Sequence, residues 1–142
     1  MIDLSLAANE NERIALELFR AMEEGTLIQR LPELVTEDFM WANSGLPTIA
    51  GRDAVIAHAR AGGFAKAIPI LATMTAFNAD VLHIASRGNI VFTERIDHHW
   101  DARGWDLMTP HIAGVVEIRQ GKASALRDFY DTKCYQQEPV AP

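Results

Sequence analysis

Apolar residues repeat with a period of two in the second half of the chain, and this pattern limits the possible folds more than any other feature. Segments rich in β-branched and aromatic residues are separated there by short runs of glycine, asparagine, serine and aspartate, which favour turns. The alternation predicts four strands, over residues 71–83, 90–100, 105–119 and 123–130. Pro110 lies inside the third strand and is expected at a bulge or an edge. Strands joined by such short turns favour an antiparallel meander.

The first third of the chain has a helical period instead. Apolar side chains recur every three or four residues from Ile14 to Met22, behind a capping pair made by Asn9 and Glu12. We expect helices over residues 10–24, 27–35 and 51–61, and a short strand over residues 39–42. Helices followed by a meander of long strands predict an α+β fold. Because long strands twist and curl, we expect the sheet and the N-terminal helices to form a cone around a deep pocket.

Length, charge and cysteine content exclude several classes of protein. The chain has 142 residues, of which 49% are hydrophobic, as expected of one domain spanning residues 1–142. Its net charge of −6 and the lack of a Lys/Arg run disfavour a nucleic-acid partner. No apolar run approaches the ~20 residues of a membrane span, and the N-terminus lacks the basic region of a signal peptide. The single cysteine, Cys134, cannot form an internal disulfide, so we expect a cytoplasmic protein.

Two of the predicted strands carry the polar residues with the clearest chemistry. Side chains alternate along a strand, so Thr93, Arg95 and Asp97 share one face of the second strand. Asp128 lies on the fourth strand and shares its face with Tyr130. Arg95 and Asp97 are ~6.6 Å apart along the strand, which is close enough for one polar cluster. If both faces turn inward, the pocket holds two carboxylates and one guanidinium.

Such a cluster suits catalysis by a general acid and a general base. Burial raises the pKa of a carboxyl group, a second carboxylate raises it further, and an arginine lowers it. The two acids can therefore differ in protonation state, so that one donates a proton while the other accepts one. Spacing alone favours a plainer alternative, an ion pair on the protein surface.

The other candidate residues have less specific patterns. His98 and His99 point to opposite faces of a regular strand, and the remaining histidines lack the spacing of metal ligands, so we expect no metal site. Cys134 has no base next to it in the sequence and is expected to pack. The chain has neither a phosphate-binding loop nor a dinucleotide-binding fingerprint, so we expect no cofactor.

Four segments together resemble the limonene-1,2-epoxide hydrolase family, within the larger NTF2-like and SnoaL-like group. The similarity extends from about Glu12 to Tyr135 and is densest at residues 39–43, 51–55, 93–97 and 127–131. Its most specific part is an Arg-x-Asp on one strand together with Arg-Asp-aromatic-aromatic-Asp on the last strand. The resemblance implies an NTF2-like α+β cone, a cofactor-independent hydrolase and a homodimer.

The resemblance also implies roles for individual residues. The family's Asp–Arg–Asp cluster matches Asp97, Arg95 and Asp128, and its water-binding Asn matches Asn43. The family's water-binding Tyr matches Trp41, which is the main departure, because an indole N–H donates a hydrogen bond but accepts none. These matches imply one-step hydrolysis of a small apolar epoxide to a vicinal diol. Asp128 would take a proton from water, and Asp97 would protonate the epoxide oxygen.

Two other classes of function stay open on the sequence. A ketosteroid isomerase or polyketide cyclase with the same fold needs one carboxylate base and no arginine between two acids. A small-molecule binding protein keeps the cone and its polar cluster without turnover. Formation of a diol from an epoxide separates the three classes.

Overall fold

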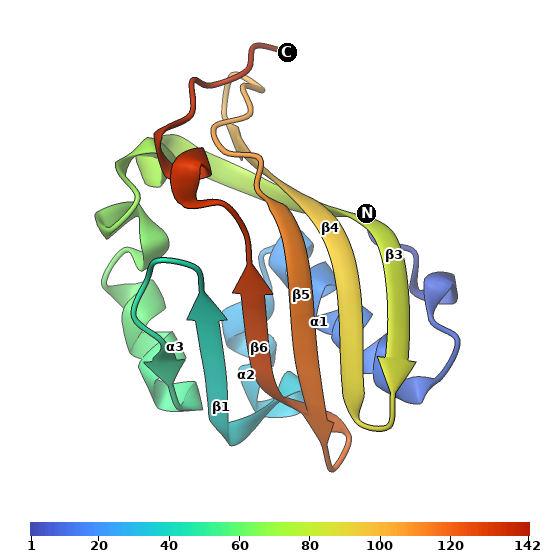
Figure 1. Cartoon of the computed structure of the whole chain (residues 1–142). Helices are drawn as coiled ribbons and strands as arrows, with labels where there is room; N and C mark the ends of the chain where they lie inside the picture. Colours follow the sequence, from blue (N-terminus) through green and yellow to red (C-terminus); the bar gives the residue numbers. More distant parts are fainter.

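The computed structural model, which describes residues 1–142, has one curved sheet with helices against its concave side (Figure 1). Six strands form the sheet in the order β2-β1-β6-β5-β4-β3. Their bounds are β1 (Val35–Asn43), β2 (Ile49–Ala50), β3 (Met74–Arg87), β4 (Ile90–Asp101), β5 (His111–Arg119) and β6 (Lys122–Phe129). Neighbouring strands are antiparallel except β1 and β6, which run parallel. The prediction of a mostly antiparallel sheet in an α+β fold is therefore confirmed.

The helices lie where the helical period predicts them. They are α1 (Glu10–Glu24), α2 (Leu27–Leu34) and α3 (Arg52–Arg60), and short 3₁₀ helices occupy Leu4–Leu6, Gly63–Lys66, Pro69–Thr73 and Thr132–Gln136. The side chain of Asn9 caps α1 by accepting a hydrogen bond from the Glu12 backbone N–H. Gly25 ends the helix with φ of 70°, a left-handed conformation that glycine adopts without strain.

Three predicted strands have wrong limits. The first long strand begins at Met74 rather than at residue 71, because Pro69–Thr73 form a 3₁₀ helix, and it continues to Arg87. The strand expected over residues 39–42 is longer, Val35–Asn43, because it pairs with β2 on one side and β6 on the other. β2 itself is too short to be recognised by periodicity.

The third correction concerns the strand expected over residues 105–119. The strand β5 begins only at His111, directly after Pro110. Proline has no N–H to donate to a strand ladder, although the Pro110 carbonyl does accept from the Asp97 N–H at 3.2 Å. Asp106 forms single bridges to Trp100 of β4 and to Val140 near the C-terminus. Residues 105–110 therefore form an irregular segment between β4 and β5, with isolated bridges in place of a continuous strand.

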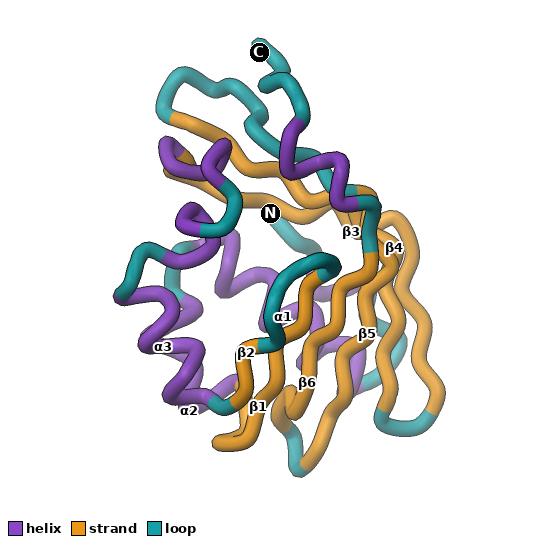
Figure 2. The backbone as a smooth tube through the Cα atoms, turned by 60° about the vertical axis from the view of Figure 1, so that its left-hand side comes forward, coloured by secondary structure: helices purple, strands orange, loops and turns teal.

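The inner face of α1 covers the concave side of the sheet. Figure 2 shows the helices as a layer on one side of the strands. Leu16, Leu18 and Phe19 of α1 are almost completely buried, as are Val91 of β4 and Val116 of β5 in the same cluster. Burial of such side chains stabilises a fold by about 1.5–3 kcal/mol each. The helix therefore closes the cone over the middle strands.

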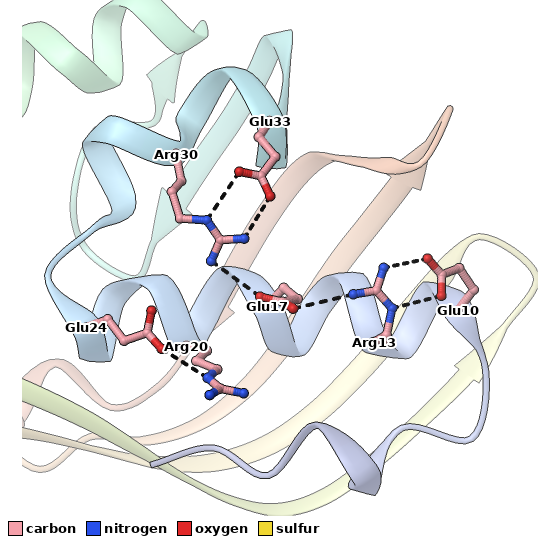
Figure 3. Close-up of polar contacts among 7 residues, drawn as sticks. All are labelled: Glu10, Arg13, Glu17, Arg20, Glu24, Arg30 and Glu33. Atoms are coloured by element: carbon pink, nitrogen blue, oxygen red, sulfur yellow. Dashed lines mark hydrogen bonds and ion pairs between the residues drawn. The ribbon is translucent and has the colours of Figure 1, made fainter.

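The outward side of α1 carries ion pairs that also reach α2 (Figure 3). Glu17 accepts from Arg13 of the same helix at 3.4 Å and from Arg30 of α2 at 3.3 Å. The chain of contacts continues from Arg13 to Glu10 and from Arg30 to Glu33. Pairs this exposed contribute only about 0–1 kcal/mol each. They mark the solvent side of the two helices, and the functional residues lie on the opposite side.

Candidate active site

Arg95 lies at the centre of the concave face, with only 1% of its surface exposed. Its Nε and Nη2 donate to the Asp97 carboxylate over 3.1 and 3.0 Å. Its Nη1 and Nη2 donate to the Asp128 carboxylate over 3.2 and 2.9 Å, and Nη1 also donates to the Thr93 hydroxyl over 3.0 Å. All five guanidinium N–H groups are thus used, and each carboxylate is held by two of them. The cluster is buried, so the alternative of a surface ion pair does not apply.

The charge of this cluster favours the uptake of one proton. Asp97 and Asp128 are each only 6% exposed, and together with Arg95 they carry a net charge of −1 when both are ionised. Burial raises the pKa of the Asp128 carboxyl, the Asp97 charge raises it further, and Arg95 opposes the shift. Burial lowers the pKa of Arg95, but the charges of Asp128 and Asp97 outweigh this effect and raise it above its ordinary value. The guanidinium therefore stays charged, and one added proton makes the buried cluster neutral.

Gly114 of β5 provides the space in which the guanidinium lies. A Cβ atom at this position would be 2.4 Å from Arg95 Nη1, 2.7 Å from Thr93 Oγ1 and 2.8 Å from Asp128 Oδ1. On the other side, the Phe19 ring of α1 faces the guanidinium, whose Cζ is 4.1 Å from the ring centroid. The cluster is thus enclosed between a strand backbone and an aromatic ring, and both keep water away from the ion pairs.

Both aspartates open onto a cavity of about 480 Å³ with mostly hydrophobic walls. Its lining includes apolar residues from the helices, the 3₁₀ segments and the sheet, among them Met22, Ile28, Phe64, Leu71, Phe77 and Ile112. The polar side chains of the lining are few, namely Asn43, Asp97, His99, Asp128 and Tyr130. An apolar pocket with a few convergent polar groups is the usual form of a site for a small molecule.

Asn43 reaches the cluster through the pairing of two strands that are distant in sequence. β1 and β6 run side by side in the same direction, and Asn43 is the register partner of Asp128 (Figure 1). Trp41 precedes it by two residues and pairs with Leu126. Both side chains line the cavity. The structure therefore brings all five predicted site residues together, three within the cluster and two on the adjacent wall.

Trp41 contacts the cavity through its ring and not through a hydrogen bond. The indole packs edge-on against Phe64, with ring centroids 5.1 Å apart and planes at 87°. Its Nε1–H is buried and has no hydrogen-bond partner in the protein. Trp41 therefore shapes the wall with its ring, while its one polar group is buried without a partner.

Tyr130 also lines the cavity and Tyr135 contacts Tyr130, and sequence reasoning assigned neither of them a role. The Tyr130 hydroxyl lies 3.1 Å from the Asn43 side-chain amide and 2.7 Å from the Tyr135 hydroxyl. A signal for Tyr130 was present, because it shares the alternation of Asp128 on the last strand. None pointed to Tyr135, which lies in the 3₁₀ helix beyond that strand.

The two adjacent histidines face opposite sides of the sheet, as the alternation predicts. His99 lines the cavity, where its Nδ1 lies 2.7 Å from the Met108 carbonyl oxygen and therefore carries the hydrogen. Burial lowers the pKa of His99, so the ring is neutral and its Nε2 is an acceptor. His98 instead contacts Asp106 and Asp80.

Cys134 packs in a small second cluster beside Leu71 and Met108. Burial raises the pKa of its thiol to about 11, so it stays protonated and unreactive at neutral pH. No three or more His, Cys, Asp or Glu side chains are grouped so that they could hold a metal ion. None of the helices is both long enough and apolar enough to span a membrane.

The family model described as the limonene-1,2-epoxide hydrolase catalytic domain matches residues 9–137. Among solved structures, the chain is similar to an LEH-like epoxide hydrolase from M. tuberculosis, with 20% sequence identity and a TM-score of 0.69. That similarity covers 89% of this chain and 86% of the other.

Two further solved structures share the architecture. One is an NTF2-like protein of unknown function from Burkholderia pseudomallei, with 19% identity, a TM-score of 0.67 and coverage of 88% and 93% of the two chains. The other is a putative SnoaL-like polyketide cyclase from Jannaschia sp., with 14% identity, a TM-score of 0.65 and coverage of 91% and 94%. These similarities confirm the predicted NTF2-like fold.

Proposed function

Because the chain belongs to the limonene-1,2-epoxide hydrolase catalytic-domain family, we propose that it hydrolyses a small apolar epoxide to a vicinal diol. The observation that carries this proposal is the pair of buried carboxylates held by one arginine at the edge of an apolar cavity. An isomerase needs one carboxylate base, and where a protonated carboxyl assists as an oxyanion donor, no arginine has to bridge the two acids. Epoxide opening uses both, because a proton must leave the attacking water while another reaches the ring oxygen.

The proposed reaction is a single step without a covalent intermediate. Asp128 takes a proton from a water molecule that Asn43 also binds, and the water oxygen bonds to one ring carbon. The C–O bond to that carbon breaks, and the ring oxygen takes the proton of Asp97. The diol leaves with Asp128 protonated and Asp97 ionised, and transfer of that proton back to Asp97 restores the resting enzyme.

The environment of Asp128 supports its role as the base. A raised pKa makes the ionised Asp128 a stronger base than an ordinary aspartate. Asp128 is also the register partner of Asn43, so the water-binding amide and the base lie on the same side. Arg95 contacts both carboxylates through Nη2, so it stabilises the negative charge whichever acid carries the proton. Acid and base catalysis each contribute about 10²–10⁴-fold.

The walls of the cavity support an apolar substrate. A volume of about 480 Å³ lies within the usual range for small-molecule sites, and most of the lining residues are hydrophobic. The homodimer implied by the family resemblance stays a prediction. Phe92 of β4 and Phe129 of β6, both about half exposed, offer apolar surface for it.

The test is an assay of diol formation over a panel of terpene, styrene and cycloalkene oxides, with a ketosteroid and a polyketide precursor as the rival substrates. We expect diol from at least one epoxide and no turnover of the rivals. A single turnover in heavy-oxygen water should then place solvent oxygen in the diol, because the base activates water directly. Unlabelled diol would indicate an ester with Asp97 or Asp128 and would contradict the one-step mechanism.

The pH dependence follows from the raised pKa of Asp128. The reactive cluster holds one proton, so kcat/KM should fall at low pH, where a second proton neutralises the base. It should also fall at higher pH, through a midpoint above the ordinary aspartate value of about 3.9, when the cluster loses the one proton that the acid must donate, so the profile is bell-shaped. Rates measured on one epoxide, with circular dichroism as a check of folding at each pH, test this. A rate that does not fall at high pH while the protein stays folded would exclude a carboxylic acid as the proton donor.

A further inference from the structure

Three short contacts between polar atoms form a chain that runs from Asn43 through Tyr130 and Tyr135 to Ser44. The Tyr130 hydroxyl lies 3.1 Å from the atom placed as Asn43 Oδ1. The Tyr130 and Tyr135 hydroxyls are 2.7 Å apart, and the Tyr135 hydroxyl donates to the backbone carbonyl of Ser44. Each contact is short enough to require a hydrogen between its two atoms.

The number of hydrogens decides how the Asn43 amide is turned. The two hydroxyls supply two hydrogens for three contacts, and the Ser44 carbonyl supplies none. Tyr135 must therefore donate to Ser44, and Tyr130 must donate to Tyr135. If Asn43 presented Oδ1 to Tyr130, this oxygen and the Tyr130 hydroxyl oxygen would face each other with no hydrogen between them. Both hydroxyl hydrogens are then used, so the hydrogen in the contact between Tyr130 and Asn43 must come from the amide nitrogen of Asn43. The oxygen and nitrogen of an amide are distinguished by their hydrogen-bond partners, and here the partner identifies the nitrogen.

The surroundings of the chain hold it in this arrangement. The Ser44 hydroxyl accepts from the Tyr130 backbone N–H at 3.0 Å and donates to the Asp128 carbonyl at 3.4 Å. The two tyrosine rings pack edge to face, with centroids 5.9 Å apart. Burial raises the pKa of Tyr130, which keeps its hydroxyl protonated. The hydroxyls therefore have little freedom to exchange their donor and acceptor roles.

We propose that Tyr130 and Tyr135 are positioning residues that turn the carbonyl oxygen of Asn43 toward the cavity, beside the carboxylate of Asp128. Asn43 lines the cavity, and its end away from Tyr130 has no other protein partner. The role of this oxygen in catalysis rests on the proposed function. A water molecule that donates one hydrogen to Asp128 and the other to Asn43 keeps its lone pairs free for the epoxide carbon. An amide nitrogen in the same place would bind those lone pairs instead.

Single and double tyrosine variants test the order of donors. In Tyr130→Phe the amide loses its anchor and turns freely, so we expect kcat to fall about tenfold, the usual effect of one lost hydrogen bond, with KM within about twofold. In Tyr135→Phe the Tyr130 hydroxyl keeps only Asn43 as an acceptor, so it donates there and reverses the amide. We expect a larger fall in kcat, about 10²-fold, although Tyr135 is further from the reacting atoms.

The double variant gives the result that a purely structural role would not. Removing the Tyr130 hydroxyl from Tyr135→Phe frees the reversed amide, so kcat should recover about tenfold, to the level of Tyr130→Phe. Thermal unfolding of each variant reports on the fold separately. Losses that add in the double variant, or a Tyr135→Phe enzyme as active as the parent, would overturn the proposal.

Neutron diffraction from crystals of the deuterated parent protein gives a direct answer that does not depend on activity. We expect deuterium on Tyr130 Oη directed at Tyr135 and an amide deuterium of Asn43 directed at Tyr130. Deuterium on Tyr130 Oη directed at Asn43 would refute the proposal. If the neutron map agrees and no epoxide is hydrolysed, the proposed function is wrong and the arrangement of donors stands.

Discussion

Asp128→Asn and Asp97→Asn should each lower kcat on an accepted epoxide by about 10²–10⁴-fold, with a much smaller change in KM. Asparagine keeps the volume of aspartate but provides neither a carboxylate base nor a carboxylic-acid proton. The change is measured as steady-state diol formation at the pH optimum of the parent enzyme. Both losses should be large, because proton removal from water and proton delivery to the ring oxygen belong to the same step.

Stability has to be followed alongside these two variants. In the parent protein each carboxylate accepts two hydrogen bonds from Arg95. In each asparagine variant an amide NH₂ group replaces one of the two accepting oxygens, so one Arg95 N–H loses its acceptor, which costs about 1–3 kcal/mol of stability. Asp53→Asn, on the exposed side of α3, is the matched control and should leave kcat unchanged. A folded Asp97→Asn or Asp128→Asn enzyme with a kcat near that of the parent would remove the proposed role of that aspartate.

Gly114→Ala should be almost as damaging, although glycine carries no functional group. The added methyl carbon would lie 2.4 Å from Arg95 Nη1 and 2.8 Å from Asp128 Oδ1, so the guanidinium must move away from the strand. Forcing an atom into a packed core costs about 1–3 kcal/mol of stability. Displacing the arginine from Asp128 by about 1 Å should cost roughly 10²-fold in kcat. Thermal unfolding and diol formation measure the two effects separately.

The neighbouring residue provides the control for this substitution. Ala113 precedes Gly114 on β5 and points to the exposed face of the sheet, so Ala113→Ser should change neither quantity. An enzyme carrying Gly114→Ala with the stability and kcat of the parent would show that Arg95 does not depend on the open space above Gly114.

Much of the cluster was predictable because it depends on local periodicity. Alternation along one strand puts Arg95 and Asp97 on the same face, and this property needs no tertiary information. Leu126 and Asp128 share a buried face of β6 for the same reason. Burial then turns this face inward, because the strand's other apolar positions, such as Val91, lie on it as well.

The strand limits were less predictable, because they depend on pairing partners. Residues 105–110 have the composition of a strand, but Pro110 lacks the N–H that a continuous ladder would use. β1 is longer than its apolar pattern suggests, because β6 supplies hydrogen bonds along it. Such contacts lie far away in the sequence, and periodicity cannot reveal them.

The sequence by itself determined the α+β class and the shared face of Arg95 and Asp97, because these follow from the spacing of residues within single elements. Only the tertiary structure decided that this face is buried against Asp128, and it decided the rest of the site as well. The parallel register of β1 and β6 brings Asn43 opposite Asp128, and the turn of the chain into its last 3₁₀ helix brings Tyr135 to Tyr130. Asn43 and Tyr130 are 87 positions apart. Their contact depends on the closure of the whole sheet, and the orientation of the amide depends on a hydrogen count that only the assembled neighbours define.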